Sequence, residues 1–233
     1  MKHFYYIALI FPLLVGCVQT EAPVVVIEQE ENQYDNIEIV STSPDGQRIV
    51  SADSDNVVLI RDIKSWEVLH RFTGHTARVR SVQFSQDGSK IITTSDDKTV
   101  RVVNADSGKE LRKFPHSGEI IFAIFSPDEE QIVIGTSDGT VRFLDAAMEK
   151  ELQKLEGHTD GIQGIVFSLD GKKIATSSDD GTARLWNVES GKELQKLEGL
   201  TGNKVAQFLF NGSGVIIIGE EESFTWYIEP SPP

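Results

Sequence analysis

The chain has 233 residues, with 36 acidic and 22 basic side chains and a formal net charge of −14. This charge argues against a nucleic-acid-binding protein and against electrostatic docking on anionic lipid, since both need a basic face. Hydrophobic residues make up 39% and charged residues 25%, proportions typical of a folded globular protein. The single cysteine excludes an internal disulfide and a cysteine-based zinc cluster.

The N-terminal segment has the pattern of an export signal. Lys2 precedes an apolar run over residues 4–16, and Cys17 follows directly. The run is shorter than the roughly 20 residues that span a bilayer, and a basic start before a short apolar stretch is typical of a secretory signal. Its end, Leu14-Val15-Gly16-Cys17, resembles the bacterial lipoprotein signal, which implies cleavage before Cys17 and acylation of its thiol. Val18 then implies export to the outer membrane of a double-membraned host, and an ordinary signal or uncleaved anchor is the alternative.

The rest of the chain contains a repeat. The turn sequence Ser43-Pro44-Asp45-Gly46 returns in related form at 85–88, 126–129 and 168–171, at intervals of 42, 41 and 42 residues, and in a worn form at 211–214. Each of the first four turns is followed by a β-branched run and then by an acidic turn, at 54–56, 96–98, 137–139 and 179–181. These turn residues and runs predict four short antiparallel strands per unit. A unit this small must stack on its neighbours, and radial stacking gives an all-β β-propeller.

The repeats resemble the WD-repeat family over residues 32–229, through Gly74-His75, Gly157-His158, the acidic turns and Leu185-Trp186-Asn187. The resemblance implies a hydrogen-bonded tetrad of a histidine, a strand Ser or Thr, a turn aspartate and a tryptophan. In this chain the tetrad positions are His158, Thr176, Asp180 and Trp186 in the fourth unit, His75, Thr93 and Asp97 in the second, His116 and Asp138 in the third, and Asp55 in the first. Only the fourth unit has all four members, so we expect uneven stability among the units.

The number of units and the closure of the ring are a separate expectation. The fifth unit ends near residue 229 without an outermost strand, and residues 23–30 precede the first unit where such a strand is needed. We expect the N-terminal strand to close a ring of five blades, which removes an exposed sheet edge. An incomplete ring, a fragment of a larger WD-repeat protein and half of a dimeric ring are the alternatives. The expected divisions are a signal peptide at 1–16, a lipidated tether at 17–22, the propeller at 23–229 and a tail at 230–233.

The candidate binding residues also come from the repeat. In the WD-repeat family partners usually meet the loops before the innermost strands, which implies Arg78, Arg80, Glu119, Gln163 and Lys204 as partner-binding candidates. Trp66 is a further candidate because it replaces the turn glycine found at Gly108 and Gly191, and packing of its ring on the stems of its own loop is the alternative. Three of the five histidines occupy the repeated position, and no Ser-His-Asp arrangement, phosphate loop or calcium loop stands out. We therefore expect no enzyme activity, no cofactor and no metal.

These features favour a non-enzymatic protein-interaction scaffold tethered to the cell envelope by a lipid anchor, with no nucleic-acid partner. A remnant without independent function and a propeller-based envelope hydrolase are the alternatives. The acidic charge lies mainly at the two ends: residues 21–38 contain six acidic side chains and residues 205–233 contain four, with no Lys or Arg in either segment. Ring closure would bring these ends together, so we expect a basic protein partner or divalent cations there. Monomer and dimer remain open.

Overall fold

The computed structural model describes residues 37–168, 170–200, 204–208, 214–219 and 223–227, with side chains placed between residues 40 and 200. The first sheet contains β1 (Ile37–Thr42), β2 (Arg48–Asp53), β3 (Val58–Asp62) and β4 (Val68–Phe72). The second contains β5 (Val79–Phe84), β6 (Lys90–Ser95), β7 (Thr99–Asn104) and β8 (Glu110–Pro115). The third contains β9 (Ile120–Phe125), β10 (Gln131–Thr136), β11 (Val141–Asp145) and β12 (Glu151–Leu155). The fourth contains β13 (Ile162–Phe167), β14 (Lys173–Ser178), β15 (Ala183–Asn187) and β16 (Glu193–Leu197).

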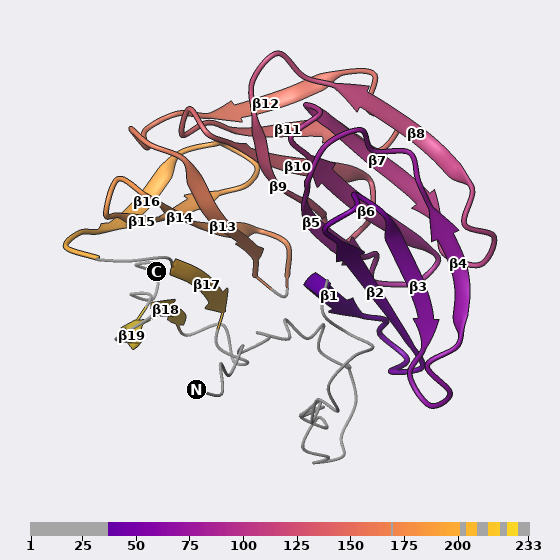
Figure 1. Ribbon diagram of the computed structural model, residues 1–233. Coiled ribbons are helices and arrows are strands. Elements are labelled where there is room, and N and C mark those ends of the chain that lie inside the picture. The colour runs from indigo at the N-terminus through magenta and orange to yellow at the C-terminus, as the bar shows by residue number, and fades with distance from the viewer. Residues whose placement is uncertain (1–36, 169, 201–203, 209–213, 220–222, 228–233) are drawn as a thin grey trace.

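The described strands after residue 200 form a fifth, three-stranded sheet, made of β17 (Lys204–Phe208), β18 (Gly214–Gly219) and β19 (Ser223–Tyr227). Strands pair antiparallel and in chain order within every sheet. The sheets follow one another around a common centre, with β1, β5, β9, β13 and β17 as consecutive inner neighbours (Figure 1). The prediction of an all-β chain of four-stranded antiparallel units is confirmed for four units. The closing strand expected at 23–30 lies outside the described residues.

The repeated Ser-Pro-Asp-Gly sequence forms the turn between the first two strands of a sheet. In the first copy, Ser43 Oγ donates to Asp45 Oδ1 at 2.5 Å and accepts from the backbone N–H of Arg48 at 2.9 Å. Gly46 then takes a left-handed backbone conformation, with φ of +66°, which a glycine adopts without steric cost. The motif recurs because each inner strand must reverse within a few residues to pair with the next strand.

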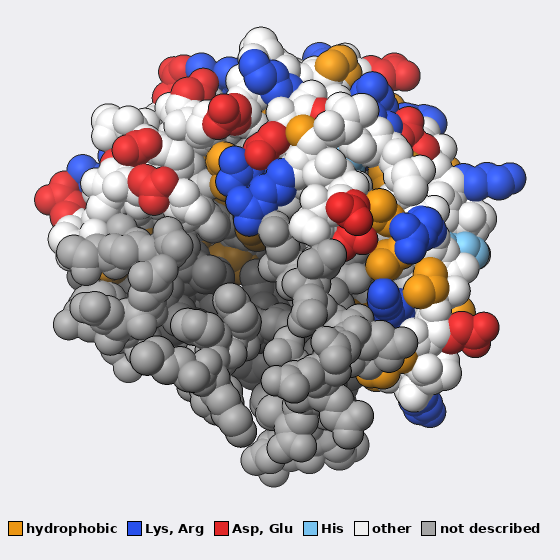
Figure 2. Space-filling view, in the orientation of Figure 1, with side chains coloured by type: hydrophobic (Ala, Val, Ile, Leu, Met, Phe, Trp, Pro, Cys, Tyr) orange, Lys and Arg blue, Asp and Glu red, His pale blue; other side chains and the backbone are white. Residues whose placement is uncertain are grey.

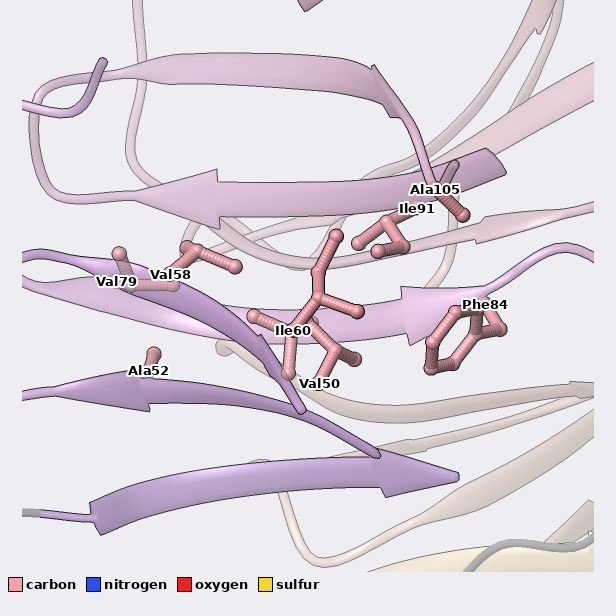
Figure 3. Close-up of a cluster of buried hydrophobic side chains, with 9 residues drawn as sticks. Val50, Ala52, Val58, Ile60, Val79, Phe84, Ile91 and Ala105 are labelled. Atoms are coloured by element: carbon pink, nitrogen blue, oxygen red, sulfur yellow. The ribbon is translucent and has the colours of Figure 1, made fainter. Parts of the chain in front are cut away.

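The hydrophobic cores lie between neighbouring sheets. One cluster joins Val50 and Ile60 of the first sheet to Val79, Phe84 and Ile91 of the second (Figure 3). The next residue, Ile92, belongs to the cluster shared with the third sheet, because successive strand side chains point to opposite faces. Ile91 and Ile92 are both fully buried. The second sheet therefore depends on both of its neighbours for its core.

Candidate protein-binding face

One end of the sheets carries the repeated histidines. The loops before β5, β9 and β13 cover residues 73–78, 116–119 and 156–161, and the turns after β6, β10 and β14 cover 96–98, 137–140 and 179–182. These segments lie at the same end of their sheets because successive strands alternate in direction. We call this end the histidine face.

A chain of hydrogen bonds fixes the histidine face in the fourth sheet. Trp186 Nε1 donates to Thr176 Oγ1 at 2.9 Å, Thr176 Oγ1 lies 2.8 Å from His158 Nε2, and His158 Nδ1 lies 2.9 Å from Asp180 Oδ2. Burial lowers the pKa of His158 despite the opposing effect of Asp180. The imidazole is therefore neutral at pH 7: it accepts from Thr176 and donates to Asp180, so all three bonds run in one direction.

Asp180 joins this chain to the loop in front of β13. Its carboxylate accepts from the backbone N–H of Thr159 at 3.0 Å, the backbone N–H of Thr182 at 2.9 Å and the Thr182 hydroxyl at 2.6 Å. Burial by itself would raise the pKa of Asp180, but the bonds from Thr182, Thr159 and His158 outweigh it and hold the pKa well below its usual range. An ionised carboxylate thus holds the loop against the turn.

The second sheet repeats the arrangement without the tryptophan. His75 Nδ1 lies 3.0 Å from Asp97 Oδ2, and His75 Nε2 lies 2.8 Å from Thr93 Oγ1. Val103 occupies the strand position that Trp186 has in the fourth sheet, so Thr93 receives no indole N–H. Burial would raise the pKa of Asp97, but hydrogen bonds from Thr99, His75 and the backbone of Thr76 lower it to about 2.

The third sheet corrects the expected pairing of His116 with Asp138. His116 Nδ1 accepts instead from the backbone N–H of Gly118 at 3.0 Å, and Asp138 accepts from the hydroxyls of Thr136 and Thr140. The physical reason is that Ile134 stands where Thr93 and Thr176 stand in the other sheets. Without a hydroxyl to donate to its Nε2, the histidine is not drawn into the sheet.

The first sheet corrects the role expected for Asp55. Its side chain is exposed, and Asp53 holds the turn by accepting from the backbone N–H groups of Asp55 and Val57 at 3.0 and 2.9 Å. Asp53 occupies the position that Ser95 has in the second sheet. There the serine hydroxyl accepts from the backbone N–H of Asp97, two residues farther along the chain, at 3.1 Å. A carboxylate at this position supplies both turn bonds, so the second carboxylate is released to solvent.

The candidate binding residues of the inner strands lie on this face. The backbone carbonyls of Arg78 and Glu119 accept from the backbone N–H groups of Asp96 and Ser137 at 2.9 and 3.0 Å, so each loop is tied to the adjacent turn. The side chains of both candidate residues point away from the core, since both residues are exposed. Their backbones are therefore fixed while their side chains face solvent.

Arg80 and Gln163 occupy equivalent positions and make equivalent contacts. Arg80 Nε donates to Asp96 Oδ1 at 2.5 Å, and Gln163 Nε2 donates to Asp179 Oδ2 at 2.6 Å. Both acceptors directly precede a network aspartate, so the rim of the face is linked to the buried histidine bonds. The Arg80 and Asp96 side chains are 37% and 31% exposed. Lys204 begins β17, and its side chain lies outside the part that the structure describes.

Trp66 lies at the other end of its sheet, in the turn between β3 and β4. Its φ is +57°, close to the +65° and +66° of Gly108 and Gly191. Trp66 therefore occupies the turn position at which the other two repeats have glycine. A tryptophan in this conformation is strained where glycine is not. Two exposed apolar side chains, Val68 and Leu69, follow on β4. The structure therefore separates Trp66 from the candidates on the histidine face.

Sequence reasoning missed the ion pairs between the two outer strands. Arg101, Arg142 and Arg184 contact Glu110, Glu151 and Glu193 respectively, at 2.5, 2.8 and 2.5 Å. The nine-residue spacing repeats in three units and was available as a signal. Figure 2 shows acidic and basic side chains mixed over the face in view, with a group of Lys and Arg side chains near β9.

Metal-binding clusters and membrane-spanning helices are the other features considered for the described residues. In residues 37–200 and the described strands beyond, no group of three or more His, Cys, Asp or Glu side chains is arranged to hold a metal ion. The described part of the chain also contains no helix long and apolar enough to cross a membrane.

Repeated four-stranded antiparallel sheets around a common centre are the architecture of a β-propeller. The model of the WD domain, G-beta repeat, matches residues 66–104, 108–145 and 149–187. The chain therefore carries WD repeats in three places, and the resemblance read from the sequence is confirmed there.

Several curated proteins are similar to part of the chain. COMPASS component SWD3 of Saccharomyces cerevisiae is 33% identical over 82 residues, which are 35% of this chain and 26% of that protein. Eukaryotic translation initiation factor 3 subunit I of Vanderwaltozyma polyspora is 27% identical over 94 residues, 40% of this chain and 27% of that protein. The U3 small nucleolar RNA-associated protein 15 homolog of Xenopus tropicalis is 33% identical over 70 residues, 30% of this chain and 14% of that protein. The chain thus matches about a quarter or less of the length of these proteins.

Proposed function

We propose that the protein is a non-enzymatic protein-interaction scaffold, tethered to a bacterial cell envelope through an acylated Cys17. The observation that carries the binding role is the histidine face: buried hydrogen bonds fix its loops, and exposed side chains vary from repeat to repeat on that fixed frame. Loops held by a rigid scaffold are common positions for binding residues. Two of the similar proteins are named as a component and as a subunit, which supports an assembly role.

The partner is a protein that meets Arg78, Arg80, Glu119 and Gln163. Arginine is enriched among the residues that dominate interface energies, and Arg80 is already oriented by Asp96. The acidic segments 21–38 and 205–233, which lie largely outside the described residues, favour a partner with a basic surface.

The envelope location rests on the sequence of residues 1–17. Leu14-Val15-Gly16-Cys17 resembles the bacterial lipoprotein signal, in which the cysteine thiol is acylated, and several acyl chains together anchor a protein stably. In a host with two membranes, Val18 directs the protein to the outer one. The ring is completed by residues 23–30 against the fifth sheet, which gives five blades.

Three measurements test these parts separately. Cys17→Ser should abolish incorporation of labelled palmitate and release the protein from membranes; retention of both would refute the anchor. The mass of the unlipidated chain in solution should be that of a monomer, and a dimer would replace the five-bladed ring by a shared one.

Capture from envelope extracts should return one stoichiometric partner for the wild type and not for a double variant, Arg78→Glu with Arg80→Glu. A matched substitution on another surface, Lys64→Glu, should leave capture unchanged.

A further inference from the structure

On the face opposite the histidine face, an arginine fills a site between the first two sheets. Arg48 lies with its guanidinium carbon 5.7 Å from the centre of the Phe84 ring. Its Nη2 donates to the carbonyl oxygen of Gly88 at 2.9 Å, and its Nη1 donates to Asp106 Oδ1 at 2.8 Å. An aromatic ring, a carbonyl and a carboxylate of the second sheet thus receive one cation from the first.

The next interface, between the second and third sheets, follows the same plan with a different cation. Lys90 begins β6 as Arg48 begins β2, and its Nζ lies 6.0 Å from the centre of the Phe125 ring. The ammonium group also contacts Glu129 Oε2 at 2.7 Å. Both interfaces are therefore filled by a basic side chain of the chain itself.

The interface between the third and fourth sheets lacks this cation. Gln131 begins β10 at the position of Arg48 and Lys90. A cavity of about 550 Å³ opens there, lined among others by Pro127, Gln131, Phe167, Gly171 and Glu189. The cavity lies where the other two interfaces hold a basic side chain.

The groups that hold Arg48 are nevertheless present at this third interface. Phe167 stands at the position of Phe84, Gly171 at that of Gly88, and Glu189 at that of Asp106. A Cβ built on Gly88 would lie 3.5 Å from Arg48 Nη2, whereas one built on Gly171 meets only Pro127 within 4 Å among the described residues. The receiving half of the site is conserved within the chain, and the space beside it is open.

The charge of the cavity also matches a cation. Asp128, Asp170 and Glu189 line it against a single basic side chain, Lys172, which leaves an excess of two negative charges. Hydrogen bonds from Ser126 and Ser168 lower the pKa of Asp128 and of Asp170, so both are ionised at pH 7. A positive ligand therefore enters a site with a negative rim and an aromatic wall.

We propose that this cavity, the Phe167 pocket, binds an arginine side chain of a partner protein. The guanidinium lies over the Phe167 ring and donates to the carbonyl oxygen of Gly171 and to the carboxylate of Glu189, as Arg48 does to Gly88 and Asp106. Arginine fits better than lysine because its planar group carries separate N–H donors that reach two acceptors at once. The chain supplies the template for this ligand at its own first interface.

The inference extends the proposed scaffold role, since it adds a peptide-binding site at the end opposite the histidine face. Its test needs no partner protein. If the pocket does not bind arginine, capture of the partner through Arg78 and Arg80 can still be observed. If that capture fails, binding of arginine to the pocket can still be measured.

The experiment titrates the isotopically labelled full chain with N-acetyl-arginine amide and follows backbone amide resonances. We expect saturable shifts centred on Gly171 and Glu189. N-acetyl-citrulline amide, which has the same shape without the charge, should cause no such shifts. Gln131→Arg should abolish the response, because the chain's own guanidinium then fills the pocket, while Gln131→Met should retain it. Shifts that persist in the Gln131→Arg chain, or equal shifts with citrulline, would overturn the proposal.

Two further variants keep the test independent of how Gln131→Arg folds. Glu189→Gln should weaken binding by about two- to fivefold, because Glu189 is exposed to solvent and an exposed ion pair contributes little. Arg48→Gln should create a second responsive site around Gly88 by vacating the first interface. An unchanged affinity in Glu189→Gln would contradict the assigned geometry, and so would tighter or equal binding of N-acetyl-lysine amide.

Discussion

The hydroxyl of Thr176 connects two buried groups, and its removal provides a direct measure of the network. Thr176 is fully buried and lies between Trp186 Nε1 and His158 Nε2. Thr176→Val keeps the shape of the side chain but leaves both the indole N–H and the imidazole nitrogen without a partner. Thr93→Val in the second sheet is the matched control, because it leaves the imidazole of His75 without its partner but involves no indole N–H.

The expected magnitudes follow from the number of stranded groups. A buried donor or acceptor left without a partner costs about 1–3 kcal/mol. Thr176→Val should therefore lower the free energy of unfolding by about 2–6 kcal/mol, and Thr93→Val by about 1–3 kcal/mol. At about 2–4 °C per kcal/mol for a protein of this size, the two variants should differ by several degrees in melting temperature.

Thermal and urea denaturation followed by circular dichroism would measure both variants. Amide hydrogen exchange should show the loss of protection in β14 and β15 for Thr176→Val and in β6 and β7 for Thr93→Val. Equal destabilisation by the two substitutions would refute the reasoning, because it would mean that the Trp186 bond contributes nothing. A loss below about 1 kcal/mol in both would refute the larger premise that these hydroxyls satisfy buried groups.

Three further predictions concern pH, the strained turn and the acidic segments. Burial lowers the pKa of His75 and His158 below 6.5, so the unfolded chain binds their protons first as pH falls; stability should be full above about pH 6.5 and decline below it, by up to about 2.7 kcal/mol per pH unit for the two together. Urea midpoints between pH 7.5 and 5.5 would measure this, and a flat profile would contradict it. Trp66→Gly should change the melting temperature by only a few degrees, because relief of about 1–2 kcal/mol of left-handed strain offsets the lost indole contacts; a large loss would show that packing dominates, and weakened partner capture would show a binding role. Calcium or magnesium should raise the melting temperature more than sodium chloride of matched ionic strength if residues 21–38 and 205–233 meet, and an equal response would refute that meeting.

The sequence predicts the strands of each sheet well because local turn residues determine where the strands end. Each Ser-x-Asp motif forces a reversal through bonds within five residues, such as those of Ser43 to Asp45 and Arg48. The networks of the second and fourth sheets were predictable for a similar reason, since each member recurs at a fixed spacing. The expectation for His116 failed because one missing hydroxyl, at Ile134, removes the bond that holds the ring in the sheet.

The Phe167 pocket could not be found from the repeat motifs alone. Its defining change is Gln131, a polar residue that is unremarkable in one unit and informative only beside Arg48 and Lys90. The contact partners, Gly171 and Glu189, belong to the neighbouring repeat and lie about 40 and 58 residues farther along the chain. Interactions between repeats depend on how sheets are placed in space, and a pattern within one repeat does not contain that information.

The placement of the cores between sheets has a consequence for how such a chain changes over generations. A sequence repeat runs from one turn motif to the next, whereas a core such as that of Val50, Ile60 and Ile91 straddles two of them. The boundaries of the sequence repeat and of the hydrophobic core therefore do not coincide. Duplication of one repeat inserts a complete interface of known chemistry, and divergence of a single contact residue, as at Gln131, alters one interface and spares the others. A chain built in this way can lengthen by duplication of a repeat, and the interfaces between its sheets can diverge one at a time.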